Sequence, residues 1–182
     1  MNLQNNEIIL KEILPKKGFF FNMTEKLRIV FSFFYLGISM LLLINMTSVF
    51  FFFAIFMFGT GLYLAFFRWI LRYSDLKNNY YLITNERIII AEKSTKEIIK
   101  EKKLEEIDQI NIEMNNKFFG NIIFGEPETI FGRNDEPFSL FKRSGMNFDE
   151  DKYTFLSVDN ISEIIPIFEN LKLKVNKTFY LH

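Results

Sequence analysis

The side chains that carry most enzyme and metal chemistry are scarce in this chain of 182 residues. It contains no cysteine, and its single histidine is His182. A histidine-based triad or a zinc site needs companions at fixed positions, which a residue at the end of this sequence lacks. Without cysteine there are no thiolate nucleophiles, disulfides or cysteine-ligated metal centres. We therefore predict a non-enzymatic protein with no catalytic residue and no cofactor.

Acidic residues come close together at two places, Asp135-Glu136 and the run Asp149 to Asp151. Such carboxylates attract divalent cations, but the order of oxygen ligands found in an EF-hand loop is missing. Paired catalytic carboxylates need environments that move their pKa values apart, and no spacing here indicates such a pair. We interpret both groups as solvated loop charge and predict no metal site. A membrane-embedded enzyme that acts on a lipid through Asp and Glu is the least favoured alternative.

Basic residues gather between positions 87 and 103, where an anionic ligand would find several cations. Arg87 follows Glu86, and lysines interleaved with glutamates come next: Lys93, Lys96, Lys100, Lys102 and Lys103. Specific binding of a lipid headgroup requires cations that converge, whereas alternating charges are typical of a solvated face. The candidate ligand or partner residues here are Arg87, Lys93, Lys96 and Lys100. For Arg87 we favour a structural role, with its stem packed on a sheet and its charge paired locally.

Two aromatic residues, Phe118 and Phe119, precede Gly120 and are the remaining candidates for a partner site. They form either an exposed apolar tip that contacts a partner or the membrane, or an ordinary buried pair. The glycines of "FFGNIIFGEPETIFG" fit no phosphate-binding loop, because no G-x-G-x-x-G or G-K-[ST] pattern follows.

A long uncharged stretch determines where these residues are placed in the cell. No charged residue occurs from Ile29 to Phe67, and Arg28 and Arg68 flank the run. The stretch divides at Asn45 to Ser48 into segments of about 18 and about 23 residues, each of which roughly matches a hydrocarbon core of about 30 Å. A cleaved signal peptide would be shorter and would start earlier. We predict a transmembrane helical hairpin with two spans.

The distribution of basic residues predicts the orientation of this hairpin. The turn between the spans carries no charge, whereas lysines and arginines precede the first span and follow the second: Lys11, Lys16, Lys17, Lys26, Arg28, Arg68, Arg72 and Lys77. Basic residues next to membrane spans are enriched on the cytoplasmic side. We expect a multi-pass protein of the cell membrane with both termini in the cytoplasm. The uncharged spans disfavour transport, which usually needs an ionisable group inside the membrane. The net charge of zero gives no indication of nucleic-acid binding.

After residue 73 the pattern changes to short runs rich in Ile, Tyr and Thr, which predict strands. Alternation in "INIEM" indicates a sheet with one buried face. The predicted strands are Tyr80 to Thr84, Arg87 to Ala91, Ile98 to Lys102, Gln109 to Met114, Asn121 to Phe124, Thr129 to Phe131, Phe138 to Phe141 and Tyr153 to Val158. The segment "DNISEIIPIFENLK" then predicts an amphipathic helix that closes a small barrel or sandwich.

The N-terminal stretch "NEIILKEILPKK" leaves two interpretations open. Its residues Ile8, Ile9, Ile13 and Leu14 have near-helical spacing, so the stretch either lies on the membrane surface as a short helix or packs on the domain that follows.

These segments, in this order, resemble the bacterial pleckstrin-homology-like (PH-like) membrane proteins. The resemblance is carried by "YYLITNERIII", "KLEEIDQINIEM", "FGNIIFG" and "FLSVDNISEIIPIFENL", and most specifically by Tyr81, Thr84 and Arg87. It implies two membrane spans followed by a seven-stranded PH-like barrel or sandwich with a C-terminal helix. It implies a fold and a membrane location rather than a reaction.

We expect a juxtamembrane segment (1–26), the hairpin (27–72), a PH-like domain (73–172) and a tail (173–182). The favoured function is a membrane-anchored scaffold or binding domain that recognises a protein segment, another copy of itself or membrane components, with lipid headgroups as potential contacts. The alternative is an auxiliary subunit of a transporter or secretion assembly.

Overall fold

The computed structural model describes residues 6–45, 47, 49–127 and 153–180. The chain divides into two compact units. We call residues 21–73 the helical unit, and residues 6–20, 74–127 and 153–180 the β unit. Each unit is described by itself.

The helical unit contains two long apolar helices, as predicted. The first is α1 (Met23–Asn45); the second is an uninterrupted series of α2 (Val49–Leu62), the π-helical turn η1 (Tyr63–Phe67) and α3 (Arg68–Asn78). The final turn of α3 belongs to the β unit. Both helices are long and apolar enough to cross a membrane. At about 1.5 Å per residue, even the shorter one exceeds a hydrocarbon core of about 30 Å.

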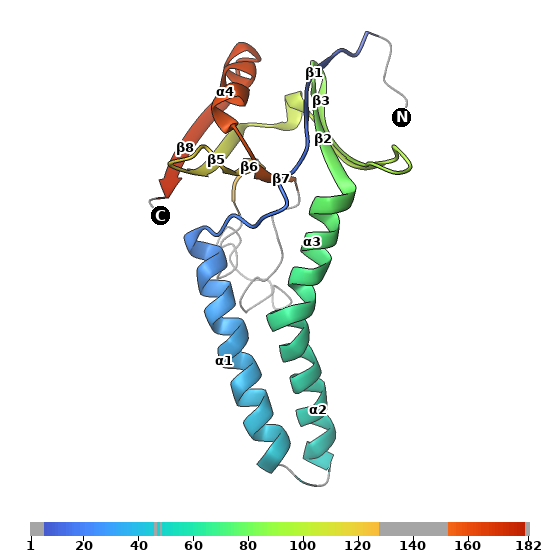
Figure 1. Cartoon of the computed structure of the whole chain (residues 1–182), viewed down its shortest axis with the longest axis vertical. Coiled ribbons are helices and arrows are strands. Elements are labelled where there is room, and N and C mark those ends of the chain that lie inside the picture. Colours follow the sequence, from blue (N-terminus) through green and yellow to red (C-terminus); the bar gives the residue numbers. More distant parts are fainter. Residues whose placement is uncertain (1–5, 46, 48, 128–152, 181–182) are drawn as a thin grey trace, which may run out of the picture. The chain divides into compact units, whose positions relative to one another are not determined.

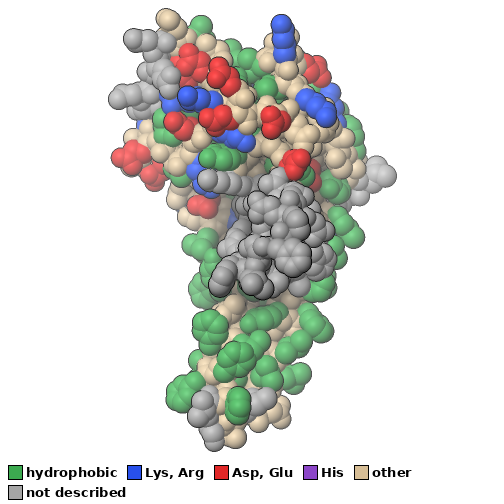
Figure 2. Space-filling model, turned by 180° about the vertical axis from the view of Figure 1, so that it is seen from behind, with side chains coloured by type: hydrophobic (Ala, Val, Ile, Leu, Met, Phe, Trp, Pro, Cys, Tyr) green, Lys and Arg blue, Asp and Glu red, His purple; other side chains and the backbone are tan. Residues whose placement is uncertain are grey.

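Most side chains on these helices face outward. Phe52 and Phe56 are 74% and 71% exposed, whereas the core helix of a water-soluble protein would bury such residues. Hydrophobic side chains cover the helices in the view of Figure 2. The two helices pack closely at Gly61, where an added Cβ would lie 3.1 Å from the Cα of Leu36 and from Ser39 Oγ. A small residue is needed at this contact.

The first sheet of the β unit is antiparallel and has the order β1-β2-β3-β4. Its strands are β1 (Ile9–Ile13), β2 (Asn79–Thr84), β3 (Arg87–Glu92) and β4 (Ile98–Lys103). Strands β1 and β2 lie side by side in Figure 1, although the whole helical hairpin separates them in sequence. The first strand of the sheet therefore precedes the helices, and the other three follow them.

The N-terminal stretch thus packs on the β domain and does not form a helix on the membrane surface. Ile13 is opposite Tyr81 and is buried with it, while Glu12 is opposite Leu82 on the other face. A bulge between Ile9 and Lys11 interrupts the register. This extra residue shifts the apolar positions, so their spacing imitates a helix although the segment is a strand.

The second sheet has the order β7-β6-β5-β8. It contains β5 (Gln109–Asn115), β6 (Gly120–Phe124), β7 (Thr154–Val158) and β8 (Lys174–Tyr180), of which β8 is parallel to β5. A 3₁₀ turn, η2 (Leu104–Glu106), precedes β5, and helix α4 (Ile161–Asn170) connects β7 to β8.

Six predicted strands and the amphipathic helix are confirmed within one or two residues at most ends. The predicted strands Thr129 to Phe131 and Phe138 to Phe141 lie outside the described residues. The predicted tail contains strand β8, which was not predicted because its apolar and polar residues do not alternate regularly. The described residues form two separate four-stranded sheets and not the closed seven-stranded barrel that was expected.

The main core lies between the two sheets and α4. Apolar packing in this core joins the two sheets, which no ladder of hydrogen bonds between the described strands connects. Tyr81 of β2 stacks on Phe155 of β7 with ring centroids 4.5 Å apart, and Phe124 of β6 contacts both Phe155 and Phe168 of α4 edge-on. Phe155 and Phe168 are fully buried. Burying each such side chain contributes roughly 1.5–3 kcal/mol.

Candidate functional site

Strands β2 and β3 are buried on both faces, which is unusual for a sheet with one core. Tyr81, Ile83, Ile88 and Ile90 belong to the main core. The opposite face, which we call the outer face, carries a second apolar cluster made of Tyr80, Leu82, Ile89 and Ala91, with Ile98 beside it. Apolar side chains are therefore buried on the outer face as well as in the main core.

A cavity of about 460 Å³ opens on this outer face, and we call it the outer pocket. It is lined by Ile9, Glu12, Leu14, Tyr80, Leu82, Lys93 and Lys96. The β1 segment supplies the first three residues, β2 the next two, and the turn between β3 and β4 the two lysines. Pockets of about 300–1,000 Å³ with an apolar lining and few polar groups are typical ligand sites.

The turn that carries the two lysines is fixed by backbone hydrogen bonds. The Lys96 N–H donates to the carbonyl of Glu92 at 3.0 Å, and Lys96 adopts a positive φ of 57°. Lys93 binds the last turn of α3: its N–H donates to the Asn78 carbonyl at 2.7 Å and its Nζ to the Lys77 carbonyl at 2.9 Å. A lysine is well suited to this place, since helix carbonyls at a C-terminus lack internal partners.

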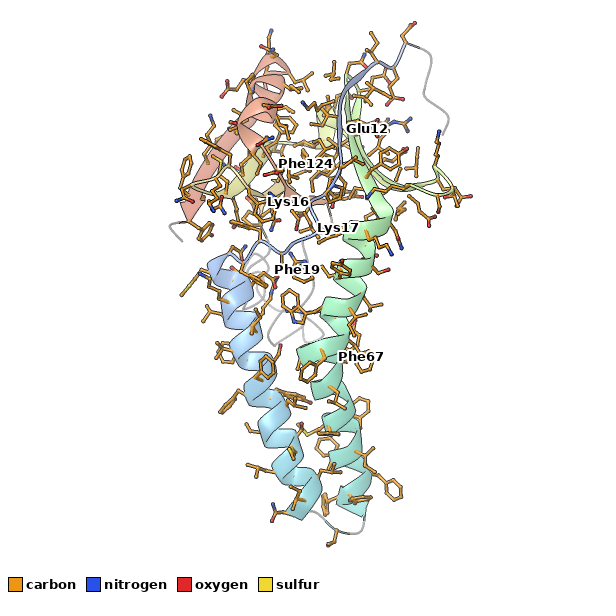
Figure 3. All side chains as sticks on the ribbon, in the orientation of Figure 1. Glu12, Lys16, Lys17, Phe19, Phe67 and Phe124 are labelled. Atoms are coloured by element: carbon orange, nitrogen blue, oxygen red, sulfur yellow. The ribbon has the colours of Figure 1, made fainter. Side chains whose placement is uncertain are left out.

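Two exposed lysines, Lys93 and Lys96, supply the positive charge in the lining of the outer pocket. Desolvation lowers the pKa of Lys93 below its usual value, and the nearby charge of Lys17 lowers it further. Lys17 follows β1 in the chain, and Figure 3 labels it together with Glu12. The lining thus contains two lysines and one carboxylate, that of Glu12, and Lys17 is a third lysine that acts on Lys93 from outside the lining. An anion bound here would relieve the repulsion between Lys17 and Lys93.

Arg87 does not line the outer pocket. Its side chain is buried, and it donates to Glu7 through Nε at 2.9 Å and Nη2 at 2.8 Å, and to Glu101 through Nη1. The hydrogen bond to Glu7 raises the pKa of Arg87; burial opposes this rise, and the charges of Glu101 and Glu7 add to it. This guanidinium is therefore engaged with two protein carboxylates, of which Glu7 lies 80 positions away in the chain.

The other candidate residues lie apart from the outer pocket. Lys100 is exposed on β4, opposite Ile90. Phe118 forms the tip of the β5–β6 hairpin with a positive φ of 56°, and it is 43% exposed. Phe119 is half-buried against Phe20, with ring centroids 6.1 Å apart. Of the six candidates, the structure brings only Lys93 and Lys96 into one cavity.

The sequence did not identify the apolar lining of the outer pocket. Ile9, Glu12 and Leu14 reach it because β1 pairs with β2 about seventy residues further along the chain. One signal was available: Tyr80 and Leu82 are apolar at positions that alternate with the core residues Tyr81 and Ile83. A strand that is apolar on both faces needs a cover or a ligand on each.

The helical unit contains a separate group of charges that the sequence also did not predict. Glu25 accepts from Arg28 at 2.6 Å, and Arg68 and Arg72 lie 3.5 and 3.4 Å from its other oxygen. Trp69 lies against the last two arginines, whose guanidinium carbons are 4.7 and 5.4 Å from its ring centroid. The arginines that flank the uncharged stretch therefore tie α1 to α3 through one buried carboxylate.

Within the described part of the chain, no three His, Cys, Asp or Glu side chains gather closely enough to hold a metal ion. Comparison of the chain with protein-family models, with curated proteins and with solved structures finds no match. The outer pocket is thus characterised by its own geometry alone.

Proposed function

We propose that the protein is a non-enzymatic, membrane-anchored binding module whose β unit has a PH-like fold and faces the cytoplasm. It recognises a protein segment, another copy of itself or membrane components. The observation that carries this proposal is the outer pocket, which is lined by apolar side chains and two lysines and belongs to a chain with two helices apolar enough to span a membrane.

The strand order supports the PH-like assignment. Among the described residues, strands β1 to β4 and β5 to β7 form two antiparallel groups and α4 follows β7, in keeping with a small β domain that a helix closes. The resemblance implies seven strands after the two spans, whereas β1 precedes them. Strand β8 is an addition to that pattern. The helical hairpin is then an insertion between the first and second strands rather than a segment that precedes the domain.

The exposed Phe side chains of α2 support the membrane anchor, because apolar surface of this extent is stable in lipid and aggregates in water. The cytoplasmic location of the β unit rests on the basic residues next to both helices.

A photo-crosslinking experiment tests the binding role. A photoreactive amino acid replaces Leu14, which is exposed and lines the outer pocket, in the full chain expressed in its native membranes. We expect a reproducible protein or lipid adduct after irradiation. The adduct should weaken when Lys93→Gln and Lys96→Gln are added, because these two lysines attract the ligand.

The matched control places the same photoreactive residue at Ile99, which is exposed on β4 and does not line the pocket. Equal adducts from both positions, or none from Leu14, would contradict a binding role for the outer pocket.

A further inference from the structure

We infer that the ligand of the outer pocket is an anionic amphiphile with a single apolar chain and a carboxylate or phosphate head. This inference rests on the proposed binding function and specifies its ligand. The same head chemistry occurs in a soluble fatty acid or alkyl phosphate and in a bilayer lipid, so the ligand has two potential sources.

The apolar chain is assigned to the floor and one wall of the pocket. Tyr80 and Leu82 form the floor, and behind them the outer-face cluster continues with Ile89 and Ala91. Leu14 is 61% exposed in the wall, so an apolar ligand would remove its surface from water. Each CH₂ group of the ligand that is buried against these apolar side chains contributes to affinity.

The charged head is assigned to the lysine side of the pocket. Lys93 and Lys96 come from one tight turn, and Lys17 approaches Lys93 closely enough to lower its pKa. An oxyanion between these ammonium groups would accept charge-assisted hydrogen bonds from them. Glu12 lines the same cavity and repels an anionic head, which is a further reason to assign the head to the lysines.

The edge of β1 argues against an extended peptide as the ligand. A strand added to this edge would meet the bulge between Ile9 and Lys11 and the charges of Lys11 and Glu12, and these features protect sheet edges from strand addition. A second copy is disfavoured as well. The antiparallel register that pairs the whole of β1 with itself places Lys11 opposite Lys11, and like charges in that position are destabilising.

The experiment uses the full chain in phosphatidylcholine nanodiscs, titrated with octyl phosphate. We expect saturable binding that is at least about tenfold tighter than binding of octyl glucoside or octyltrimethylammonium, because only octyl phosphate has an anionic head for the lysines. Inorganic phosphate should have a Kd at least about ten times that of octyl phosphate, because it lacks the apolar chain.

Two pairs of variants locate the site. The variant Lys93→Gln/Lys96→Gln should raise the Kd for octyl phosphate about tenfold, whereas Lys100→Gln/Lys103→Gln removes the same charge from β4 and should leave it unchanged. Likewise Leu14→Glu should abolish binding of octyl phosphate. Leu10 is exposed but does not line the pocket, so Leu10→Glu should leave binding intact. Partition of the probe into the disc is the same for all variants and cancels in these ratios.

Nanodiscs that contain phosphatidic acid distinguish the two sources. A higher apparent Kd for octyl phosphate in these discs identifies a competing bilayer lipid, and an unchanged Kd identifies a soluble ligand; both results support the inference. Absence of octyl phosphate binding, or equal loss in the β4 control, overturns it. A protein adduct at position 14 together with no octyl phosphate binding would overturn this inference and leave the proposed binding function intact.

Discussion

At the scale of single residues, the ion pair between Glu7 and Arg87 buries two charges that depend on each other for solvation. The Glu7 side chain has no exposed surface, and it also accepts from Thr84 Oγ1 at 2.9 Å. Removing one partner of a buried pair leaves the other charge in a medium that solvates it poorly. The pair therefore holds the N-terminal segment on β2 and β3.

We predict that Arg87→Met destabilises the β unit by about 3–5 kcal/mol, because Glu7 is left buried without its main cation. Amide hydrogen exchange of β1 to β3 in the detergent-solubilised full chain measures the loss. The double variant Glu7→Met/Arg87→Met is the control and should recover a large part of it, since no isolated charge remains. A double variant as unstable as the single one would contradict this account.

The sequence was informative about Arg87 and uninformative about its partner. An arginine in a strand of alternating pattern was expected to pair locally, yet the carboxylate that binds it is 80 positions away in the chain. The same reason explains the outer pocket: Lys93 and Lys96 were found as candidates within one hairpin, but Ile9, Glu12 and Leu14 meet them only through the pairing of β1 with β2.

At the scale of elements, periodicity located the strands whose partners are near in sequence. The segment Gln109 to Met114 alternates strictly, and β5 begins at Gln109 and ends at Asn115. Strands β1 and β8 were not predicted. β1 contains a bulge that disturbs its alternation, and most residues of β8 are exposed, so neither shows the period of a half-buried strand.

The β5–β6 hairpin has a close backbone approach that only glycine permits. A Cβ at Gly120 would lie 1.8 Å from the Glu113 carbonyl oxygen and 2.7 Å from the Met114 Cα. We predict that Gly120→Ala destabilises the β unit by at least about 1–3 kcal/mol, because backbone atoms must move. Hydrogen exchange of β5 and β6 measures the effect.

Gly18 provides the matched control, because a Cβ there would meet nothing within 4 Å. Gly18→Ala should leave exchange in β5 and β6 unchanged. Equal protection of the hairpin in both variants would show that the strands separate enough to accept a methyl group at position 120.

At the scale of the whole molecule, the absence of cysteine allows the proposed topology to be tested with single introduced cysteines. Thr47 is exposed between α1 and α2, and Ser94 is exposed in the turn between β3 and β4. We predict that a membrane-impermeant maleimide labels Thr47→Cys in intact cells, because the proposed topology places the hairpin turn outside. Ser94→Cys should be labelled only after lysis, because the proposed topology places the β unit inside.

Labelling of both positions after lysis shows that both cysteines are reactive and serves as the control. Labelling of Ser94→Cys in intact cells would place the β unit outside and contradict the cytoplasmic location. Extraction of the chain into buffer without detergent would contradict the membrane anchor itself.

The position of β1 ahead of the helices links assembly of the sheet to insertion of the hairpin. A ribosome releases β1 first, and its partner β2 emerges only after both apolar helices have been made. If a single helix were to cross the bilayer, the two strands would be stranded in different compartments and the sheet would lack its first member. Glu7 would then not reach Arg87, and the guanidinium would lose its buried partner. Completion of the first sheet therefore requires that the hairpin return β2 to the side on which β1 lies.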